Sequence, residues 1–492
     1  MDFAKALKNE SAKTYTENGA QALNTTGNAV LDLFGTIGAL RNADDNRITT
    51  KFAEAYRQDR LLATKCLFYA RDVRGGLGER HVFRTLLKYA ATHHQEALRK
   101  NLLLIPEYGR WDDIYALIGT PLEEAMWRIV KTRFNADIIN MAANLPISLM
   151  AKWLKTPDAS SKETRRLGRI TARGLGMDTR AYKRHLRTLR KYLKVTEVSM
   201  SANKWNEIDY SGVPSRAAMI YRCAFRRHDE MRYNEFLEKV TKGEAKINAS
   251  TLYPYDIIEN YLKESRNQWS LNISHENATL EAQWKALPNY VEKGTNAIVV
   301  ADTSGSMYGR PMNSAVGLAI YFAERNTGAY HNLWMSFSEE STIHKVTGET
   351  LAQKLRSINT SDWGCNTNLA KAFRRVLKIA IDNNVKPEEM VKSIIVISDM
   401  EIDACAGRSW TFYDKMAEEY AEHGYEIPNV VFWNVDSRQD VFHADSKRKG
   451  VQLCSGQSTS TFKNLIGCIG MTPVEMMLEV LNSERYAPIT IA

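Results

Sequence analysis

The stretch that decides the fold of the C-terminal part of the chain is Ala297-Ile298-Val299-Val300-Ala301-Asp302-Thr303-Ser304-Gly305-Ser306-Met307. Its first five residues form a short, continuous apolar run, which is typical of a parallel strand buried on both faces. An Asp-x-Ser-x-Ser pattern follows, so oxygen-bearing side chains come directly after a buried strand. Open α/β sheets bind ligands outside the carboxyl ends of their strands, and this placement therefore predicts a binding site.

Similar apolar runs recur downstream, at residues 333–337, 394–397 and 430–435. Helical patterns lie between them, at residues 368–381 and 411–423. Alternating strands and helices predict a doubly wound α/β domain, which we assign to residues 291–492. The change of pattern falls at residues 287–295.

Two further segments carry oxygen atoms at the expected places. Thr367 precedes the helical pattern that starts at residue 368, and Asp399 closes the apolar run 394–397. Mg²⁺ prefers octahedral coordination by hard oxygen ligands, and hydroxyl groups can supply these directly or a carboxylate can act through a bound water. The sequence therefore predicts a site for Mg²⁺ (or Mn²⁺) made by Asp302, Ser304, Ser306, Thr367 and Asp399.

This set of residues resembles the metal-ion-dependent adhesion site (MIDAS) of the von Willebrand factor A family, which has Asp-x-Ser-x-Ser, then Thr, then Asp. The resemblance implies one open coordination position, which accepts a carboxylate or another oxygen from a protein partner. Glu401 and Asp403 follow Asp399 at alternate positions. Two readings of them stay open: they tune the metal through hydrogen bonds to its ligands, or they are solvated acids on a loop.

The N-terminal part has a different pattern. Residues 1–27 are polar, whereas residues 28–290 carry apolar side chains at three- and four-residue spacing, as in Phe83, Leu86 and Leu87. Short breaks containing Gly or Pro separate the segments. Helices of 10 to 20 residues joined by short turns predict a helical-repeat array. No repeat is visible in the sequence itself.

Positive charge is concentrated between residues 161 and 195, where twelve Lys or Arg residues face only Glu163 and Asp178. Tyr182, Leu186 and Leu189, with Leu193, form an apolar stripe that we expect to face the core. The basic residues step by threes and fours along other faces, and ten of them are candidate RNA contacts: Arg165, Arg169, Arg173, Arg180, Lys183, Arg184, Arg187, Arg190, Lys191 and Lys194.

Like charges at these spacings repel one another, and a bound polyanion relieves that repulsion. RNA does so and adds the gain from counterion release. The competing interpretation is a solvated helix surface without a ligand, which is common for charged helices.

Two junctions in the helical part carry a second resemblance. They are Arg71-Asp72-Val73-Arg74-Gly75-Gly76-Leu77-Gly78-Glu79-Arg80 and Gly109-Arg110-Trp111-Asp112-Asp113. Both are similar to segments of the TROVE module of Ro ribonucleoproteins, and Trp205–Tyr210, Val213–Ser215 and Ser398–Glu401 are similar to an uncharacterised TROVE-like family. For Arg71, Arg74, Arg80 and Arg110 we expect capping and pairing with acids such as Asp113, in preference to RNA contact.

The resemblance implies a ring of HEAT-like helical repeats followed by a von Willebrand A domain, with small structured or misfolded RNA bound by the helical part. The function expected is thus a non-catalytic RNA-binding scaffold. The alternative is a protein-binding adaptor that uses the helical array and the metal site without RNA. An enzyme is the third reading, but no ATP-binding, HExxH or nucleophile–base motif is present.

Composition limits the remaining classes. The chain has 492 residues, 44% hydrophobic and 25% charged, which is ordinary for globular domains and long enough for more than one core. A net charge of +9 favours an acidic partner. Six scattered cysteines without a CxxC pair, no signal-peptide pattern and no apolar run of membrane-spanning length lead us to expect a cytoplasmic protein with no membrane contact.

Overall fold

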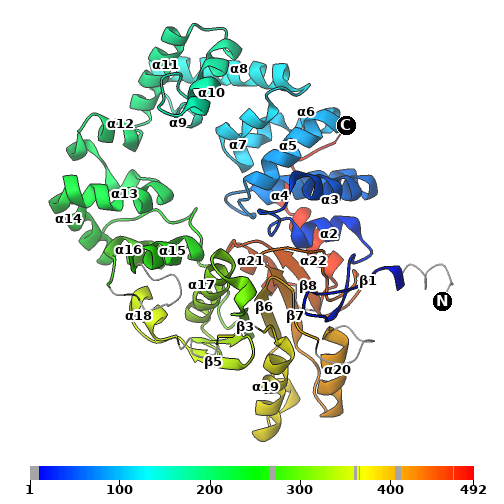
Figure 1. Cartoon of the computed structure of the whole chain (residues 1–492). Coiled ribbons are helices and arrows are strands. Elements are labelled where there is room, and N and C mark those ends of the chain that lie inside the picture. The colour runs from blue at the N-terminus through cyan, green and yellow to red at the C-terminus, as the bar shows by residue number, and fades with distance from the viewer. Residues whose placement is uncertain are drawn as a thin grey trace. The chain divides into compact units, whose positions relative to one another are not determined.

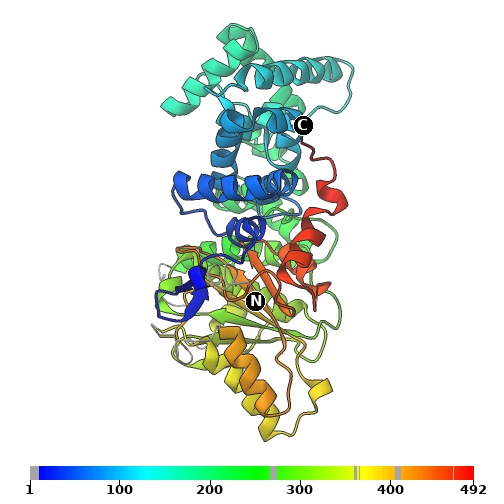
Figure 2. The ribbon, with the colours of Figure 1, turned by 90° about the vertical axis from the view of Figure 1, so that its right-hand side faces the viewer.

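The computed structural model of the chain describes residues 10–265, 273, 275–358, 363–364, 366–404, 412–468 and 470–491 (Figure 1; Figure 2). The chain forms two compact units, and each unit is assembled from separate parts of the sequence. Unit 1 contains the N-terminal residues up to Cys66, Gly75–Leu77 and Ala249–Tyr486. Unit 2 contains Leu67–Arg74, Gly78–Asn248 and the residues from Ala487 onward.

Unit 1 is built around a sheet that has, among the described residues, six strands in the order β5-β4-β3-β6-β7-β8. β5 runs antiparallel to β4, and all other neighbours are parallel. β3 and β6 are buried along their whole length, as apolar runs in a parallel sheet require. The strands are β3 (Ala297–Asp302), β4 (Leu333–Phe337), β5 (Ser341–Lys345), β6 (Ser393–Ser398), β7 (Asn429–Asn434) and β8 (Val451–Ser455).

Helices cover both faces of this sheet. Successive side chains of a strand point to opposite faces, and β7 illustrates this. Trp433 contacts Phe462 of α21, whereas Phe432 contacts Phe412 of α20. Figure 1 shows α17 and α19 on opposite sides of the sheet. The helices after β3 are α17 (Arg310–Arg325), α18 (Leu351–Arg356), α19 (Leu369–Asp382), α20 (Phe412–Glu422), α21 (Thr461–Ile466) and α22 (Pro473–Leu481).

The N-terminal residues belong to the same unit as the sheet. β1 (Lys13–Tyr15) and β2 (Gln21–Leu23) form an antiparallel hairpin, and the backbone of Leu23 exchanges two hydrogen bonds of 2.8 Å with Phe442. α2 (Ala29–Thr36) starts at Asn28, whose side chain accepts a hydrogen bond from the Leu31 N–H, and packs on β7 and β8. α3 (Asp45–Gln58), α15 (Pro254–Ser265) and α16 (Ala278–Lys285) complete the unit, which also holds the first half of α4 (Arg60–Arg71).

Unit 2 is helical throughout its described residues. Its helices are α5 (His81–His93), α6 (Gln95–Lys100), α7 (Ile105–Tyr108), α8 (Glu123–Ala142), α9 (Met150–Trp153), α10 (Lys162–Gly174), α11 (Thr179–Tyr192), α12 (Thr196–Ser201), α13 (Ser215–His228) and α14 (Glu230–Thr241). Short 3₁₀ turns join them, including η2 (Trp111–Leu117). On α11 the side chains of Tyr182, Leu186 and Leu189 are buried, which confirms the predicted apolar stripe.

A buried charge cluster lies between α4, α5 and η2. The carboxylate of Asp113 is fully buried and accepts hydrogen bonds from Arg71 Nε (2.8 Å), Arg84 Nε (2.7 Å) and the Arg110 N–H (3.0 Å). A Cβ on Gly109 would come within 2.5 Å of Asp113 Oδ2, so only glycine fits there. The pairing expected for Arg71 is therefore present, and Arg74 instead pairs with Glu107.

The predicted change from a helical region to an α/β region is confirmed, whereas the repeat type remains a prediction. The apolar runs predicted β3, β4, β6 and β7 but did not indicate β5 and β8. The boundary predicted near residue 291 follows the change from helix to strand along the chain, but packing groups α2, α3, α15 and α16 with the sheet. No helix of the described residues is long and apolar enough to cross a bilayer.

Candidate metal site at the edge of the sheet

The strand order changes direction where β3 and β6 lie side by side. The chain leaves β3 toward β4 on one side, whereas β6 and then β7 lie on the other side. Connections therefore diverge at the carboxyl ends of β3 and β6, which is the place where open α/β sheets bind ligands. Asp302 is the last residue of β3, and Asp399 directly follows β6.

Asp302 has no exposed surface, yet both of its carboxylate oxygens are hydrogen-bonded. Oδ1 accepts from the Ser304 N–H (2.9 Å) and Oδ2 accepts from Ser398 Oγ (2.6 Å). Burial and the neighbouring Asp399 carboxylate raise the pKa of Asp302, and the hydrogen bonds from Ser398 and Ser304 oppose that rise. Two buried carboxylates next to each other favour a proton or a cation between them.

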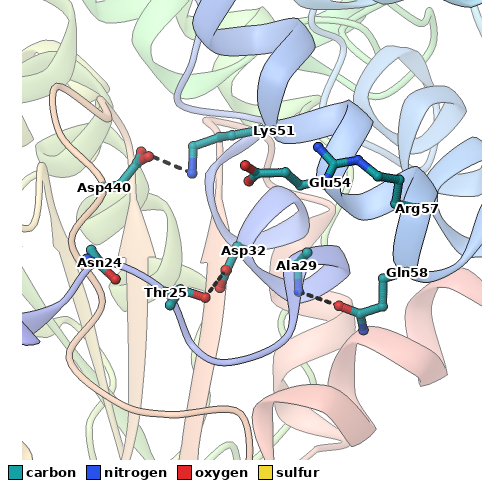
Figure 3. A pocket seen from close by; sticks show the side chains of 9 residues that line it. All are labelled: Asn24, Thr25, Ala29, Asp32, Lys51, Glu54, Arg57, Gln58 and Asp440. Carbon is teal, nitrogen blue, oxygen red and sulfur yellow. Dashed lines mark hydrogen bonds and ion pairs between the residues drawn. The ribbon is translucent and has the colours of Figure 1, made fainter. Parts of the chain in front are cut away.

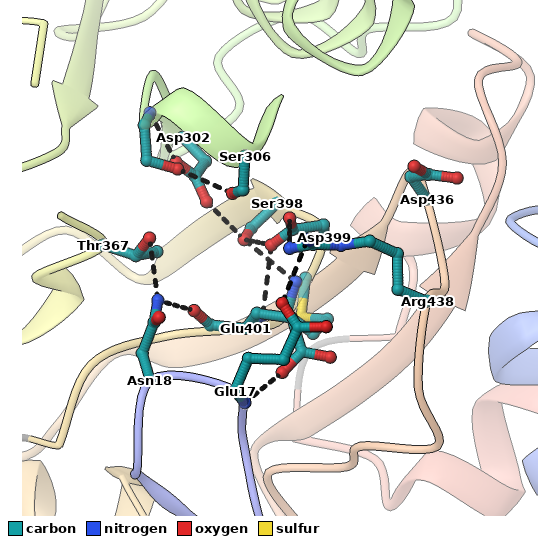
Figure 4. A network of polar contacts seen from close by, with 12 residues as sticks. Glu17, Asn18, Asp302, Ser306, Thr367, Ser398, Asp399, Glu401, Asp436 and Arg438 are labelled. Carbon is teal, nitrogen blue, oxygen red and sulfur yellow. Dashed lines mark hydrogen bonds and ion pairs between the residues drawn. The ribbon is translucent and has the colours of Figure 1, made fainter. Parts of the chain in front are cut away.

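The two serines of the Asp-x-Ser-x-Ser pattern face each other. Ser304 precedes the 3₁₀ turn η5 (Gly305–Met307), and this turn brings Ser304 Oγ to within 3.1 Å of Ser306 Oγ. Ser304 is buried, whereas Ser306 is exposed. Figure 4 shows Asp302, Ser306, Thr367 and Asp399 gathered at one edge of the sheet, as the sequence predicted.

Thr367 is fully buried in the segment before α19. Its N–H donates to Asp403 Oδ2 (3.1 Å), and its carbonyl accepts from the Asp403 N–H (2.9 Å). Asn368, the next residue, caps α19 by accepting a hydrogen bond from the Lys371 N–H. Asp403 thus holds Thr367 in place, and the interpretation that it tunes a metal stays a prediction.

Asp399 is paired with a cation from another loop. Its Oδ2 lies 2.6 Å from Arg438 Nη2, and its Oδ1 accepts from the Glu401 N–H (3.1 Å). The side chain of Glu401 is buried, and burial together with Glu17 and Asp399 raises its pKa. Glu401 Oε2 accepts a hydrogen bond from the Glu17 N–H (2.7 Å).

The oxygen atoms of the five predicted ligands fit a hard divalent cation. Two carboxylates and three hydroxyls are oxygen ligands of the kind that Mg²⁺ selects, and of the two buried carboxylates only Asp399 has a cationic partner among the described residues. Arg438 already brings positive charge to Asp399. Among the described residues no group of three or more His, Cys, Asp and Glu could hold a metal, and a hydroxyl-rich site is not of that type.

Sequence reasoning missed four residues of this neighbourhood: Glu17, Asn18, Ser398 and Arg438. Asn18 Nδ2 donates to Thr367 Oγ1 (3.3 Å) and to the Glu401 carbonyl (2.6 Å). Glu17 Oε2 lies 3.0 Å from Arg438 Nη1. The Asn18-Gly19 dipeptide is a turn signal that indicates the hairpin, but nothing local in the sequence indicates its target.

The ten candidate RNA contacts fall into two groups. Three are used within the protein: Arg165 donates to the carbonyls of residues 159 and 160, Lys183 pairs with Asp158, and Arg190 donates to the carbonyls of residues 151 and 154. Burial lowers the pKa of Arg190. The other seven are exposed and form no side-chain hydrogen bond or ion pair with a described residue: Arg169, Arg173, Arg180, Arg184, Arg187, Lys191 and Lys194.

A separate cavity of about 700 Å³ lies in unit 1 between α2, α3 and the loop that holds Asp440 (Figure 3). Asp440 forms ion pairs with Lys51 (3.0 Å) and Arg47 (2.7 Å), and Asp32 accepts hydrogen bonds from Thr25 and Thr26. Among the charged residues that line this cavity, Lys51 and Asp440 pair with each other.

Comparison with known proteins places the chain in a family. The chain belongs to the family described as "Domain of unknown function (DUF2828)", which matches residues 16–134 and 131–295. Residues 296–485 match a second family, "Domain of unknown function (DUF7788)". The chain is also similar to "Uncharacterized protein L728" of Acanthamoeba polyphaga mimivirus, with 28% identity over 520 residues that cover 97% of this chain and 89% of the relative.

Proposed function

We propose that this protein is a non-catalytic scaffold whose α/β region is a von Willebrand A-type domain that binds Mg²⁺ or Mn²⁺. The observation that carries the proposal is the gathering of Asp302, Ser306, Thr367 and Asp399 at the switch point of the sheet (Figure 4). These residues come from three segments separated by tens of residues, and their oxygen atoms match the preference of a hard cation.

The bound cation supplies a Lewis-acidic position at which an oxygen of a partner completes the coordination. The protein contributes placement: Ser398 holds Asp302, Asp403 holds Thr367, and η5 presents Ser304 and Ser306. A single metal site rich in hydroxyl groups favours binding of a partner over catalysis of hydrolysis. Hydrolytic metal sites use two metal ions, or one metal ion that activates a bound water.

Thermal unfolding of the full-length protein tests this proposal. A ligand that binds only the native state raises its stability, by about 2.7 kcal/mol at 100 times Kd, which corresponds to several degrees in Tm. We expect millimolar Mg²⁺ or Mn²⁺ to raise the Tm, and Asp302→Asn to abolish the rise while keeping the size of the side chain. Absence of any rise both in the wild type and in Arg438→Gln, which lacks the guanidinium paired with Asp399, rejects the metal site.

A matched control uses a carboxylate away from the site. Asp382 is exposed near the end of α19 and pairs with Lys378 on the same helix. Asp382→Asn removes the same charge as Asp302→Asn, so it should keep the metal-dependent rise in Tm. Loss of the rise in both variants would assign it to general screening of surface charge.

A second function, RNA binding along α10 and α11, is favoured by one observation. Seven exposed Lys and Arg side chains, six on these helices and Lys194 just after α11, have no ion-pair partner among the described residues. Such a row repels itself, and a polyanion such as a small structured or misfolded RNA relieves the repulsion.

The alternative to RNA binding is a protein-binding adaptor that uses the helical region and the metal site alone. The ultraviolet absorbance ratio of purified full-length protein distinguishes the two. Copurified nucleic acid, released by high salt, supports RNA binding. A protein-like ratio together with no affinity for added RNA at low salt supports the adaptor.

A further inference from the structure

The turn of the N-terminal hairpin rests on the loop that carries the candidate metal ligand Asp399. Thr16 Oγ1 donates to the Ile402 carbonyl (2.7 Å), and the Glu17 N–H donates to Glu401 Oε2 (2.7 Å). Gly19 forms an isolated antiparallel bridge with Asp403. The turn Thr16–Gly19 is thus attached to the residues that directly follow Asp399, although nearly 400 residues of sequence separate them.

Asn18 touches the candidate site itself. Its side-chain amide donates to Thr367 Oγ1 (3.3 Å) and to the Glu401 carbonyl (2.6 Å). A hydroxyl oxygen has two lone pairs, so this hydrogen bond uses one acceptor position of a predicted metal ligand. Asn18 therefore lies at the rim where the oxygen of a docking partner would have to enter.

Arg438 links the turn to Asp399. One guanidinium nitrogen lies 2.6 Å from Asp399 Oδ2 and another lies 3.0 Å from Glu17 Oε2. A cation bound to the Asp399 carboxylate competes with the guanidinium for the same negative charge, because two positive groups at one carboxylate repel each other. If Arg438 leaves Asp399, the fixed position of its pair with Glu17 is lost as well.

The turn is held by polar contacts, of which the Thr16 hydrogen bond is buried and those of Glu17 and Asn18 are part-buried. Glu17, Asn18 and Gly19 are exposed, and only Thr16 and Ala20 are buried. A hydrogen bond of this kind contributes only about 0.5 to 1.5 kcal/mol net, so a partner that supplies equivalent polar groups can take its place. Glu401 Oε1 is buried without a hydrogen-bond partner among the described residues, so it can still accept a hydrogen bond from a further donor.

We propose that the turn Thr16–Gly19 and Arg438 form an internal latch that occupies the docking position of the candidate metal site. This inference rests on the proposed function. Metal binding displaces Arg438 from Asp399 and loosens the turn, and a partner then docks by replacing Glu17 and Asn18 with a carboxylate-bearing segment of its own. Metal and hairpin are thereby negatively coupled, and any factor that tightens one weakens the other.

Calorimetric titration of the full-length protein with Mg²⁺ tests the coupling. Arg438→Gln removes the competing cation, so we expect its affinity for Mg²⁺ to rise on the order of tenfold. The matched control is Arg448→Gln, because Arg448 is exposed to a similar extent and pairs with Asp414 in the same unit at the same distance of 2.6 Å. It should leave the affinity unchanged. Melting temperatures without metal establish that each variant is folded.

The outcomes separate the latch from the metal site. Binding by the wild type with tighter binding by Arg438→Gln alone supports both, and binding by Arg438→Gln in the absence of measurable wild-type binding supports the latch still more strongly. Equal affinity in all three proteins overturns the latch and leaves the site standing. No binding by any of them overturns both.

Hydrogen exchange gives a readout that a purely structural hairpin would not move. The Glu17 amide is bonded to Glu401 Oε2, and Leu23 is paired with Phe442. We expect saturating Mg²⁺ to speed exchange in residues 16–19 while Leu23 stays protected. Slower or unchanged exchange at the turn in a protein that binds Mg²⁺ overturns the latch.

Discussion

The two charged regions of the molecule differ in how the protein holds its charges. At the candidate metal site Asp302, Thr367 and Asp399 are buried, and each has named partners within hydrogen-bonding distance. On α10, on α11 and just after α11, the seven basic side chains named above are exposed and have no ion-pair partner among the described residues. In the first region the side chains are held in place by their partners, whereas in the second region the charges are spread over exposed side chains.

This difference predicts how a substitution changes the free energy of unfolding in each region. Removing a buried charge leaves its partner uncompensated, so the effect is large and local. Removing an exposed charge changes a screened potential, so the effect on the free energy of unfolding is small and appears mainly in salt-dependent binding. If burial determines how much stability a substitution removes, buried charges should give a larger loss than exposed charges within a single unit as well.

The largest effect on stability is expected for Asp113→Ala in unit 2. This change leaves Arg71, which is buried, without its carboxylate partner and also removes an acceptor for Arg84. The expected loss is about 3 to 5 kcal/mol in the free energy of unfolding of unit 2, measured by urea denaturation.

The control for Asp113 is Asp158→Ala in the same unit. Asp158 is exposed and pairs with Lys183. Its loss should be below about 1 kcal/mol. Similar losses for the two aspartates would break the comparison between buried and exposed charges.

A smaller, pH-dependent effect is expected at the half-buried Asp440. Burial raises its pKa, but Lys51 and Arg47 outweigh burial and leave the pKa below the ordinary value. The unfolded chain therefore binds the proton more readily, so the pairs stabilise the fold above a pH of about 4 and lose this contribution as the pH falls through the folded pKa.

Asp440→Asn measures that contribution. We expect a loss of no more than about 1 kcal/mol at neutral pH, because the side chain is partly exposed to solvent. The difference between wild type and variant, taken from urea denaturation, should shrink at acidic pH. A difference that stays constant between pH 7 and pH 3.5 would exclude titration of Asp440 as its source.

The smallest effect on stability is expected for the triple change of Arg184, Arg187 and Lys191 to Gln. These side chains are exposed, and Gln keeps helix propensity, so the free energy of unfolding should change by about 0.5 kcal/mol or less. RNA binding should change more. About six phosphate contacts give a slope of log K against log salt near −4, and losing three contacts should flatten it by about 2 units.

A triple change of the same charge elsewhere in unit 2 is the control. Lys239, Lys242 and Lys246 are exposed at the end of α14 and in the segment that follows it. Changing them to Gln should leave the salt slope nearly unaltered. Equal flattening in both triples would mean that RNA responds to net charge alone, and unaltered slopes in both would return α11 to the class of solvated helices.

The sequence predicted the centre of the candidate site because its determinants are local. Apolar runs end at Asp302 and just before Asp399, and carboxyl ends of parallel strands meet at one edge. The buried face of α11 was predicted for the same reason, since Tyr182, Leu186 and Leu189 repeat at helical spacing. By contrast, β8 contains Gln452, Cys454 and Ser455, and this mixture of residue types does not indicate a strand. The structure nevertheless forms an edge strand here, and all of its residues are buried.

The surroundings of the site could not be predicted because they depend on contacts distant in sequence. Glu17 and Asn18 lie in a polar segment, and their hydrogen bonds reach residues in the second half of the chain. Arg438 lies in a loop with no periodicity, and its ion pair with Asp399 follows only from the way β6 and β7 end side by side. Likewise, Arg190 seemed a free cation until its bonds to two backbone carbonyls were visible.

Each of the two units is assembled from segments that lie far apart in the sequence, and this has a consequence for folding during translation. Unit 1 contains the first strands to leave the ribosome, but the Glu17 amide meets its acceptor only 384 residues later. At about 5 to 20 residues per second, that interval lasts roughly 20 to 80 s. Unit 2 also stays incomplete until late in translation, because the Asn101 side chain donates a hydrogen bond to the carbonyl of Thr490, 389 residues downstream. Each unit therefore lacks part of its residues until most of the other unit has been translated, and the nascent hairpin spends most of that time without its partners.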